Sequence, residues 1–287
     1  MTATVHGRIL YRGRDVMVRF QEANHRISTR ADDMKFLDNR DVYVRSETRW
    51  GEAEGLEGFE RFLITQYLDP AGSTLEAGCG GGRILRAMQE MGFTRMCGFD
   101  AVPQFIALAR RKDSDGAISF DVQNATHLKY ASESVDQIIY WGQLLSLLES
   151  AADRLAAVRE ARRVLKRSGR ALLSFCCAET RRAERIYLPY LLYVRCLRCL
   201  LGKRLTLQSL PWLRLRGKPN WRALLDAGPY VYWYHVDEAV HLLESQGFRI
   251  LGMGNSRQPE RDGICTSRAQ LLKRRATSHL YIIAEGA

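Results

Sequence analysis

An alternation of two kinds of short segment over residues 73–176 constrains the fold of this chain more than any other feature. Apolar runs typical of buried strands cover residues 73–77, 96–100, 117–121, 135–140 and 170–176. Amphipathic runs with helical spacing lie between them at 83–91, 103–111 and 151–165. Because strands that alternate with helices pair in parallel through right-handed crossovers, the pattern predicts an α/β fold built on a parallel sheet.

We divide the chain around this core into four parts, which are residues 1–68, 69–178, 179–229 and 230–287. The first part is mixed and polar, and it ends in an expected helix at 57–68. The third part is an insertion rich in Leu, aromatic and basic residues, and we expect it to be helical. The last part resumes the alternation with a helix at 236–246 and strands at 248–252 and 279–286.

The segment LEAGCGGGRIL, residues 75–85, carries four glycines, at positions 78, 80, 81 and 82, directly after the first expected strand. In a doubly wound sheet, ligands bind at the carboxyl ends of the strands, so this loop is expected to lie at a binding site. A triphosphate loop needs Lys and then Ser or Thr after its last glycine, whereas Arg83 and Ile84 stand there. A dinucleotide fingerprint needs a small residue at the position of Arg83. The loop therefore favours neither ligand.

The loop, with Glu76 before it, resembles the first motif of the class I S-adenosylmethionine-dependent methyltransferases. The resemblance continues through four further motifs, which are Gly98-Phe99-Asp100, Asp121 to Leu128, Val135 to Gln143 and Glu160 to Gly169. The motifs follow in the family's order, and the likeness covers 57–178 and again 230–286. It implies a doubly wound, Rossmann-like sheet of seven mostly parallel strands with an antiparallel last strand, and S-adenosyl-L-methionine as the cofactor.

The resemblance also implies a set of cofactor-binding residues. They are Glu76, Gly78, Gly80, Asp100, Ala101, Asn124, Ala125, Trp141, Gln143 and Trp50. Glycines let the loop backbone approach the ligand, and Glu76 is expected to orient the loop and the amino group of the cofactor. Asp100 is expected to accept hydrogen bonds from both ribose hydroxyls.

The remaining cofactor contacts are expected from three other segments. Asn124 stands where the family usually has Asp, and its side-chain oxygen is expected to accept from the adenine amino group, while the N–H of Ala125 donates to the ring. Trp141 and Gln143 follow the fourth strand and are expected at the methionine end. Trp50 belongs to an N-terminal aromatic segment expected to fold over the cofactor, whose positive sulfonium favours an aromatic face.

Methyl transfer from a sulfonium is an in-line displacement, for which positioning of the acceptor matters most. A general base is needed only where the acceptor must lose a proton early, as a hydroxyl does. We choose His235 as the candidate base because it ends the aromatic run Tyr230 to His235, between the insertion and the resumed core. The alternative is a hydrophobic hinge before an N-capping Asp237. We expect no metal site.

The formal net charge of +11 is concentrated in residues 179–222, which hold eleven Lys or Arg against two Glu. Arg195 and Arg198 are expected to share one helix face beside a broad apolar surface. Three interpretations stay open: a lid whose arginines meet an acidic substrate, a helix lying on an anionic membrane surface, and a contact with nucleic-acid phosphates. The last is weakest, because no RNA-binding module is recognisable. The insertion also offers a surface for a homodimer.

Location and function follow from these observations. The first sixteen residues lack the apolar core of a signal peptide, and the longest apolar stretch, 186–201, is interrupted by Pro189, Arg195 and Arg198. We therefore expect a cytoplasmic enzyme, with residues 179–222 able to contact the inner membrane surface. The expected reaction is methyl transfer to a small-molecule, saccharide or lipid-linked acceptor at oxygen. Methylation of nucleic acid and cofactor binding without catalysis remain the alternatives.

Overall fold

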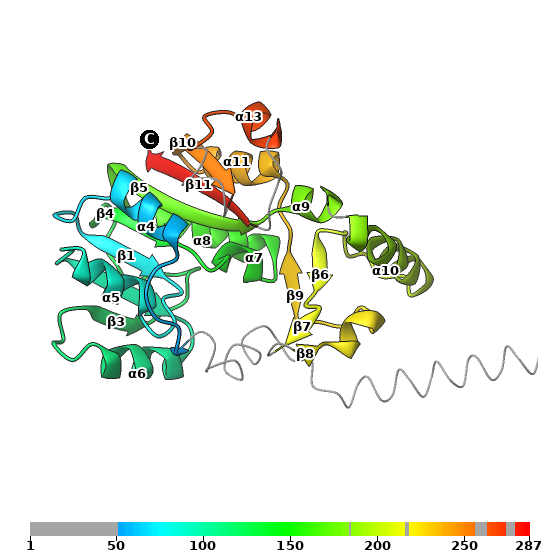
Figure 1. The fold of residues 1–287 in the computed structure, drawn as a ribbon, viewed down its shortest axis with the longest axis horizontal. Coiled ribbons are helices and arrows are strands. Elements are labelled where there is room, and N and C mark those ends of the chain that lie inside the picture. The colour runs from blue at the N-terminus through cyan, green and yellow to red at the C-terminus, as the bar shows by residue number, and fades with distance from the viewer. Residues whose placement is uncertain (1–50, 184, 216–217, 256–262, 274–278) are drawn as a thin grey trace, which may run out of the picture. The chain divides into compact units, whose positions relative to one another are not determined.

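A computed structural model describes residues 51–183, 185–215, 218–255, 263–273 and 279–287 of the chain (Figure 1). Its centre is a seven-stranded sheet in the order β10-β11-β5-β4-β1-β2-β3. In that order the strands are β10 (Phe248–Asn255), β11 (His279–Gly286), β5 (Leu165–Cys176), β4 (Val135–Tyr140), β1 (Thr74–Ala77), β2 (Met96–Asp100) and β3 (Ser119–Val122).

The strand directions confirm the expected topology. From β3 to β5 every neighbouring pair is parallel, whereas β11 is antiparallel to both β5 and β10, between which it is inserted. The chain leaves β1 toward β2 on one side and returns to β4 on the other. This reversal of strand order beside β1 is the place where doubly wound sheets bind their ligands.

Helices cover both faces of the sheet (Figure 1). One apolar cluster includes residues of α4 (Gly58–Tyr67), α5 (Arg83–Glu90) and α6 (Pro103–Lys112). A second cluster includes residues of α7 (Leu144–Leu147), α8 (Ala151–Val164), α11 (Val236–Glu244) and α13 (Arg268–Lys273). Along β4, Ile138 and Tyr140 belong to one cluster and Ile139 to the other. This explains the continuous apolar runs, because a strand covered on both faces needs apolar residues at every position.

Most expected bounds hold closely in the core, because local signals mark them. The exception is β5, which begins at Leu165 and not at residue 170. Pro103 stands in the first turn of α6, where a missing N–H costs nothing. Ser150 caps α8 by accepting a hydrogen bond from the N–H of Asp153 at 2.9 Å. The third strand differs slightly, since β3 begins two residues later than the apolar run and ends at Val122.

The insertion, defined here as residues 178–232, contains the expected helices and, in addition, four short strands. Its helices are α9 (Ala178–Ala183), η1 (Arg185–Tyr187), α10 (Leu188–Leu200) and η2 (Trp221–Leu225). Its strands are β6 (Ser209–Pro211), β7 (Arg214–Leu215), β8 (Lys218–Pro219) and β9 (Tyr230–Tyr232). Strand β9 pairs with β6 and not with the central sheet, so the insertion extends beyond residue 229. A pairing between segments some twenty residues apart leaves no local periodicity to detect.

Arg198 corrects one expectation. Its guanidinium is buried and lies 2.8 and 2.7 Å from the two carboxylate oxygens of the fully buried Asp226, while Arg195 is exposed. The same guanidinium donates to the carbonyls of Thr206 and Ser209 at 2.5 and 2.6 Å. The two arginines therefore do not share a face, because Arg198 joins α10 to the rest of the insertion and is not available to an acidic substrate.

Within the described ranges, no helix has both the length and the apolar character needed to cross a bilayer.

Candidate cofactor site and catalytic pair

The backbone conformation of the glycine loop explains why glycines stand in it. Gly78, Gly80 and Gly82 have φ values of +64°, +54° and +77°, in the left-handed region that glycine adopts without the steric penalty of a side chain. A Cβ at Gly82 would also lie 2.8 Å from the ring of Phe120. The chain thus reverses tightly after β1 and enters α5, whose first N–H groups have no partner within the helix.

The segment before α4 lies against this loop. A Cβ on Gly81 would come within 2.3 Å of the carbonyl oxygen of Gly51, so only glycine fits there. Glu54 holds the segment in place through Arg86 at 2.6 Å and Lys112 at 2.7 Å. These two cations lower the pKa of Glu54 to about 2. Trp50 itself lies outside the described residues, so its expected place over the cofactor stays a prediction.

Arg83 shows why the loop departs from the dinucleotide fingerprint. Its guanidinium binds both carboxylate oxygens of Glu60 on α4, at 2.6 and 2.7 Å, and also donates to the carbonyl of Gly55 at 2.7 Å. The residue therefore turns toward the N-terminal helix. The position that stays small in dinucleotide sites serves here to join α5 to α4.

Asp100 ends β2 and faces the glycine loop. Its Oδ2 accepts a hydrogen bond from the N–H of Gly80 at 3.0 Å, and its Oδ1 accepts from the N–H of Val102 at 2.9 Å. Burial raises the pKa of this carboxyl, an effect that hydrogen bonds from the backbone of Val102, Gly80 and Ala101 oppose. Each carboxylate oxygen has a second lone pair, so Asp100 can hold the loop and still accept from a ligand hydroxyl.

Glu76 is the most unusual group at the carboxyl ends of the strands. It is 3% exposed, and its Oε2 has no hydrogen-bond partner among the described residues. Burial raises the pKa of this carboxyl to about 8. A buried carboxylate without a partner is costly, and such strain is found where a bound ligand completes the site.

The segment after β4 approaches the loop from the other side. Gly142 and Gln143 have φ values of +63° and +58°, and the N–H of Gln143 donates to Ser174 Oγ at 3.0 Å. A Cβ on Gly78 would lie 3.1 Å from Leu144 Cδ1. Gln143 therefore lies at the expected edge in a conformation that non-glycine residues rarely adopt. Trp141 was also expected at the methionine end of the cofactor, but its side chain is 3% exposed and packs edge-to-face on Tyr281.

The segment after β3 forms a small turn. Asn124 is exposed, and its Oδ1 accepts a hydrogen bond from the N–H of Thr126 at 3.0 Å. This bond makes Asn124 a turn residue in the structure, and one oxygen lone pair remains for an adenine contact. Ala125 is buried beside it, and Ala101 is exposed directly after β2.

His235 pairs with a residue that the sequence did not single out. Its Nδ1 lies 3.1 Å from Oε1 of Glu179, which also accepts from the N–H of Val236 at 3.2 Å, and Cys177 Sγ lies 3.3 Å from Oε2. Burial raises the pKa of Glu179, but its hydrogen bonds outweigh this effect and the pKa is lowered. A bridge between Cys177 and Tyr234 places the pair beside the carboxyl end of β5.

The other candidate bases are less suited. Tyr234 is 1% exposed, and its hydroxyl points to the carbonyl of Leu145 at 3.4 Å. His127 and His241 are exposed, and His279 begins β11. Glu179 could not have been found from the sequence, because it lies 56 residues from His235 and no local pattern connects them.

The fold and the groups at the carboxyl ends of its strands can now be compared with known protein families. A sheet with an antiparallel strand inserted next to its edge carries a left-handed glycine loop after β1 and an acid at the end of β2. Residues 75–173 match the family described as a methyltransferase domain. Over residues 75–173 the chain is therefore similar to this family, and its fold is that of S-adenosylmethionine-dependent methyltransferases; the matched domain implies S-adenosyl-L-methionine as the cofactor.

Particular relatives share parts of the chain. The ubiquinone biosynthesis O-methyltransferase of Xanthomonas oryzae pv. oryzae (strain PXO99A) is 26% identical over 145 residues, which span 47% of this chain and 59% of that protein. A SAM-dependent methyltransferase from Methanosarcina mazei superposes with a TM-score of 0.57 at 19% identity, covering 81% of this chain and 98% of that one. The complex of the Haloferax volcanii Trm112 methyltransferase activator with a putative methyltransferase gives 0.56 at 16% identity, covering 87% and 97%. Both structures share the fold.

Proposed function

We propose that this protein transfers the methyl group of S-adenosyl-L-methionine to an oxygen atom of a small-molecule or lipid-linked acceptor. The observation that carries the proposal is the buried Glu76, whose Oε2 lacks a partner among the described residues and lies beside the left-handed loop and Asp100. A positively charged amino group fits this carboxylate, and the glycines leave room for the ligand backbone to approach. The residues present therefore fit the cofactor of the family.

Each residue has a role in holding the cofactor. Glu76 accepts from the amino group, Asp100 accepts from the ribose hydroxyls, and Asn124 with Ala125 borders the adenine. Ala101 and Gln143 border the ribose and the methionine end. The bound cofactor supplies an electrophilic methyl group on a sulfonium. The protein's own contribution is to orient the acceptor and to exclude water.

An acceptor hydroxyl must also lose its proton, and His235 with Glu179 suits this task. The contact of Nδ1 with Glu179 at 3.1 Å holds the imidazole in one orientation and favours the tautomer with its proton on Nδ1. The Nε2 atom is then the basic nitrogen, on the side of the ring away from Glu179. We assign His235 as the general base and Glu179 as its positioning residue.

The choice of an oxygen acceptor has support from the curated relative, whose name describes an O-methyltransferase of ubiquinone biosynthesis. The His235–Glu179 pair supports the same choice, because a base is required for a hydroxyl and dispensable for a neutral amine. Two alternatives remain testable. Methylation of nucleic acid would use the basic insertion, and a non-catalytic protein would bind the cofactor without turnover.

The test uses the purified full-length protein, labelled S-adenosylmethionine and a cell extract separated into lipid, saccharide, small-molecule, protein and nucleic-acid fractions. Label in one of the first three fractions supports the proposal, and label in the nucleic-acid fraction contradicts it. Cofactor binding by calorimetry without label in any fraction would favour the non-catalytic alternative.

Variants then test the catalytic pair on the labelled acceptor. His235→Ala is expected to lower kcat by about 10²- to 10⁴-fold, the usual contribution of a general base. Glu179→Gln is expected to lower kcat less and to change the pH profile of kcat, while cofactor affinity stays unchanged. His241→Ala is the matched control, since His241 is exposed on the helix that His235 precedes. Equal activity in His235→Ala and the control would remove His235 from the mechanism.

A further inference from the structure

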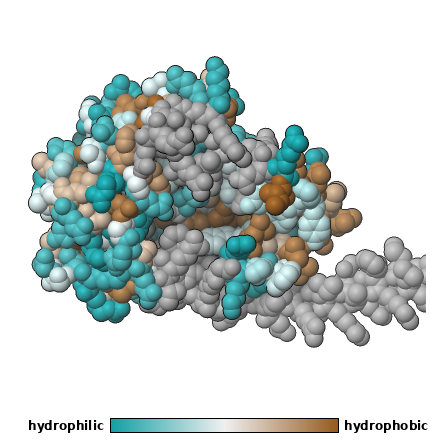
Figure 2. Space-filling model, in the orientation of Figure 1, coloured by the Kyte–Doolittle hydropathy of each residue, from teal (hydrophilic) through white to brown (hydrophobic). Residues whose placement is uncertain are grey.

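The insertion exposes apolar side chains to an unusual degree. Ile186 is 80% exposed, Leu192 62%, Leu200 84%, Trp221 73% and Leu225 65%. Isolated exposed leucines are ordinary on a protein surface, but a contiguous group of large apolar side chains marks an interaction site. Figure 2 shows brown, apolar residues interleaved with teal ones on the right-hand lobe, where Figure 1 places α10.

Two neighbouring helices carry four of these residues, Leu192 and Leu200 on α10 and Trp221 and Leu225 on η2, and we call their exposed side the insertion face. Helix α10 turns Val194 and Arg198 inward, so Leu192, Cys196 and Leu200 lie on its opposite, outward side. Helix η2 packs beside α10, because Tyr193 Oη donates to the carbonyl of Leu224 at 2.5 Å. The helix thus presents apolar residues on both sides, and only the inner side is covered by the described part of the chain.

The outer side of the insertion is positively charged as well as apolar. Residues 185–225 contain nine Lys or Arg and no Asp or Glu. The buried Asp226 neutralises Arg198, which leaves Arg185, Arg195 and Arg204 exposed among the apolar side chains. A surface that is both apolar and positive complements a layer that is negative at its boundary and apolar beneath it.

We infer that the insertion face docks on an anionic lipid surface, with the leucines and Trp221 in the acyl boundary and the arginines at lipid phosphates. A second copy of this chain is disfavoured, since two faces without acidic residues repel one another. Nucleic acid is disfavoured because the exposed leucines would meet its polar backbone. A membrane also needs no shape complementarity, which suits a convex helix. This inference goes beyond methyl transfer and does not depend on it.

The test measures co-sedimentation of the full-length protein with vesicles of phosphatidylcholine, with and without phosphatidylglycerol. We expect binding to the anionic vesicles, weak binding to the neutral ones, and loss of binding as salt screens the arginines. The double variant Leu192→Glu/Leu200→Glu is expected to bind anionic vesicles about 30-fold less, because two buried apolar contacts become charged. Arg195→Glu is expected to reduce binding about tenfold.

The matched control is Leu272→Glu, since Leu272 is 42% exposed on α13, outside the insertion. It is expected to bind vesicles as the wild type does. Unchanged S-adenosylmethionine affinity in every variant shows that the fold is intact and separates this test from that of the proposed reaction. Absence of vesicle binding by the wild type would overturn the inference. So would a wild-type dimer that the double variant converts to a monomer without any change in vesicle binding.

Discussion

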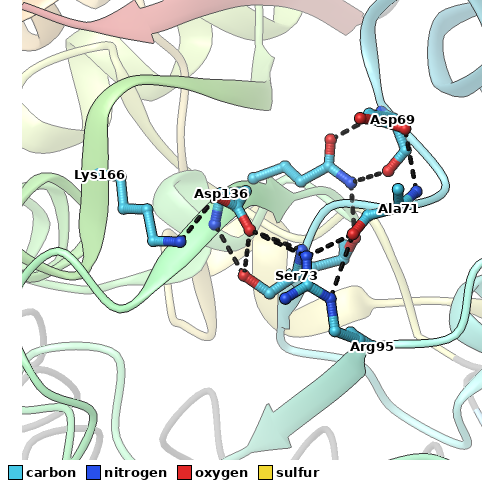
Figure 3. A network of polar contacts seen from close by, with 8 residues as sticks. Asp69, Ala71, Ser73, Arg95, Asp136 and Lys166 are labelled. Carbon is cyan, nitrogen blue, oxygen red and sulfur yellow. Dashed lines mark hydrogen bonds and ion pairs between the residues drawn. The ribbon is translucent and has the colours of Figure 1, made fainter.

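Acidic residues at the two ends of the central sheet have opposite surroundings. At the amino ends of the strands, Asp136 accepts from the N–H and Oγ of Ser73 at 2.9 and 2.7 Å and pairs with Lys166 at 2.8 Å (Figure 3). At the carboxyl ends, Glu76 is more deeply buried, yet its Oε2 has no partner among the described residues. Folding of the chain therefore supplies hydrogen-bond partners for the acid at the amino ends, but it supplies none among the described residues for Oε2 of the acid at the carboxyl ends.

The electrostatic consequences are opposite as well. The hydrogen bond from Lys166, followed by those from Ser73, holds the pKa of Asp136 well below its usual range. Burial moves the pKa of Glu76 upward, to about 8. A paired acid contributes stability, whereas a buried, unpaired acid costs stability until a cation arrives. The sheet thus has a paired acid that stabilises it at one end and, at the other, a buried acid whose environment favours a cationic ligand.

The largest effect that would test the comparison is loss of Asp100. Asp100→Ala removes an acceptor from the N–H groups of Gly80 and Val102 and from the expected ribose hydroxyls. We expect the Kd for S-adenosylmethionine, measured by calorimetry, to rise about 100-fold or more, as two charge-assisted hydrogen bonds are lost. Asp136→Ala is the control at the other end and should leave Kd unchanged. An unchanged Kd in Asp100→Ala would move the ribose away from β2.

Glu76→Gln is expected to have the next largest effect, with opposite signs on binding and on stability. Because the folded pKa of Glu76 is about 8 and its ordinary value is 4.5, the unfolded chain loses this proton first as pH rises. The wild type therefore loses stability between about pH 4.5 and pH 8, a loss that the Glu76→Gln variant avoids. Denaturation without cofactor should show the variant more stable by about 4 kcal/mol at pH 8 and by about 1 kcal/mol at pH 5.

Binding should respond in the other direction. Glu76→Gln is expected to raise the Kd for S-adenosylmethionine about tenfold, since one charge-assisted bond is lost. At pH 7 the wild type should release a proton on binding, visible by calorimetry in buffers of different ionisation enthalpy, and the variant should not. If both proteins release the same number of protons, Glu76 does not face the amino group.

The core of this structure was predictable because its signals are local. The apolar run at 135–140 and the helix beginning at Pro103 are fixed by side chains within a few positions of one another, and the structure confirms both. The closeness of the glycine loop and Asp100 was predictable because they follow successive strands, and the hydrogen bond from the N–H of Gly80 to Asp100 confirms it; the cofactor contacts themselves stay a prediction. That Oε2 of Glu76 lacks a hydrogen-bond partner among the described residues could not be predicted, since it depends on every neighbour that fails to reach it.

The insertion was poorly predictable for the same physical reason. Its organising contacts join Arg198 to Asp226, β6 to β9 and Glu179 to His235, and the members of each pair lie far apart in the sequence. The leucine-rich composition predicted helices, which is correct for α10 and wrong for the strands that follow it. Charge counting predicted a basic surface but not that Arg198 is buried and neutralised.

A smaller effect, on stability alone, is expected at the amino end. Asp136→Ala removes the partner of Ser73 and Lys166, and it should lower the free energy of unfolding by about 1–2 kcal/mol, discounted because Asp136 is partly exposed. Because its folded pKa is depressed, this contribution is present above about pH 4 and is lost as pH falls further. The difference between variant and wild type in urea denaturation should therefore shrink in acid. A difference that stays constant with pH would mean that the charge of Asp136 contributes little.

The smallest expected effect separates backbone strain from ligand contact. Gly78 and Gly116 have nearly equal φ values of +64° and +63°, so an alanine at either should cost about 1–2 kcal/mol of stability. A Cβ at Gly116 meets nothing within 4 Å, whereas one at Gly78 lies 3.1 Å from Leu144, whose flexible side chain can move. We expect similar melting temperatures for Gly78→Ala and Gly116→Ala, but weaker S-adenosylmethionine binding only for the first. If both variants bind the cofactor equally well, the loop at Gly78 needs its glycine for the turn alone, and the contrast between the two ends of the sheet rests on Glu76 and Asp100.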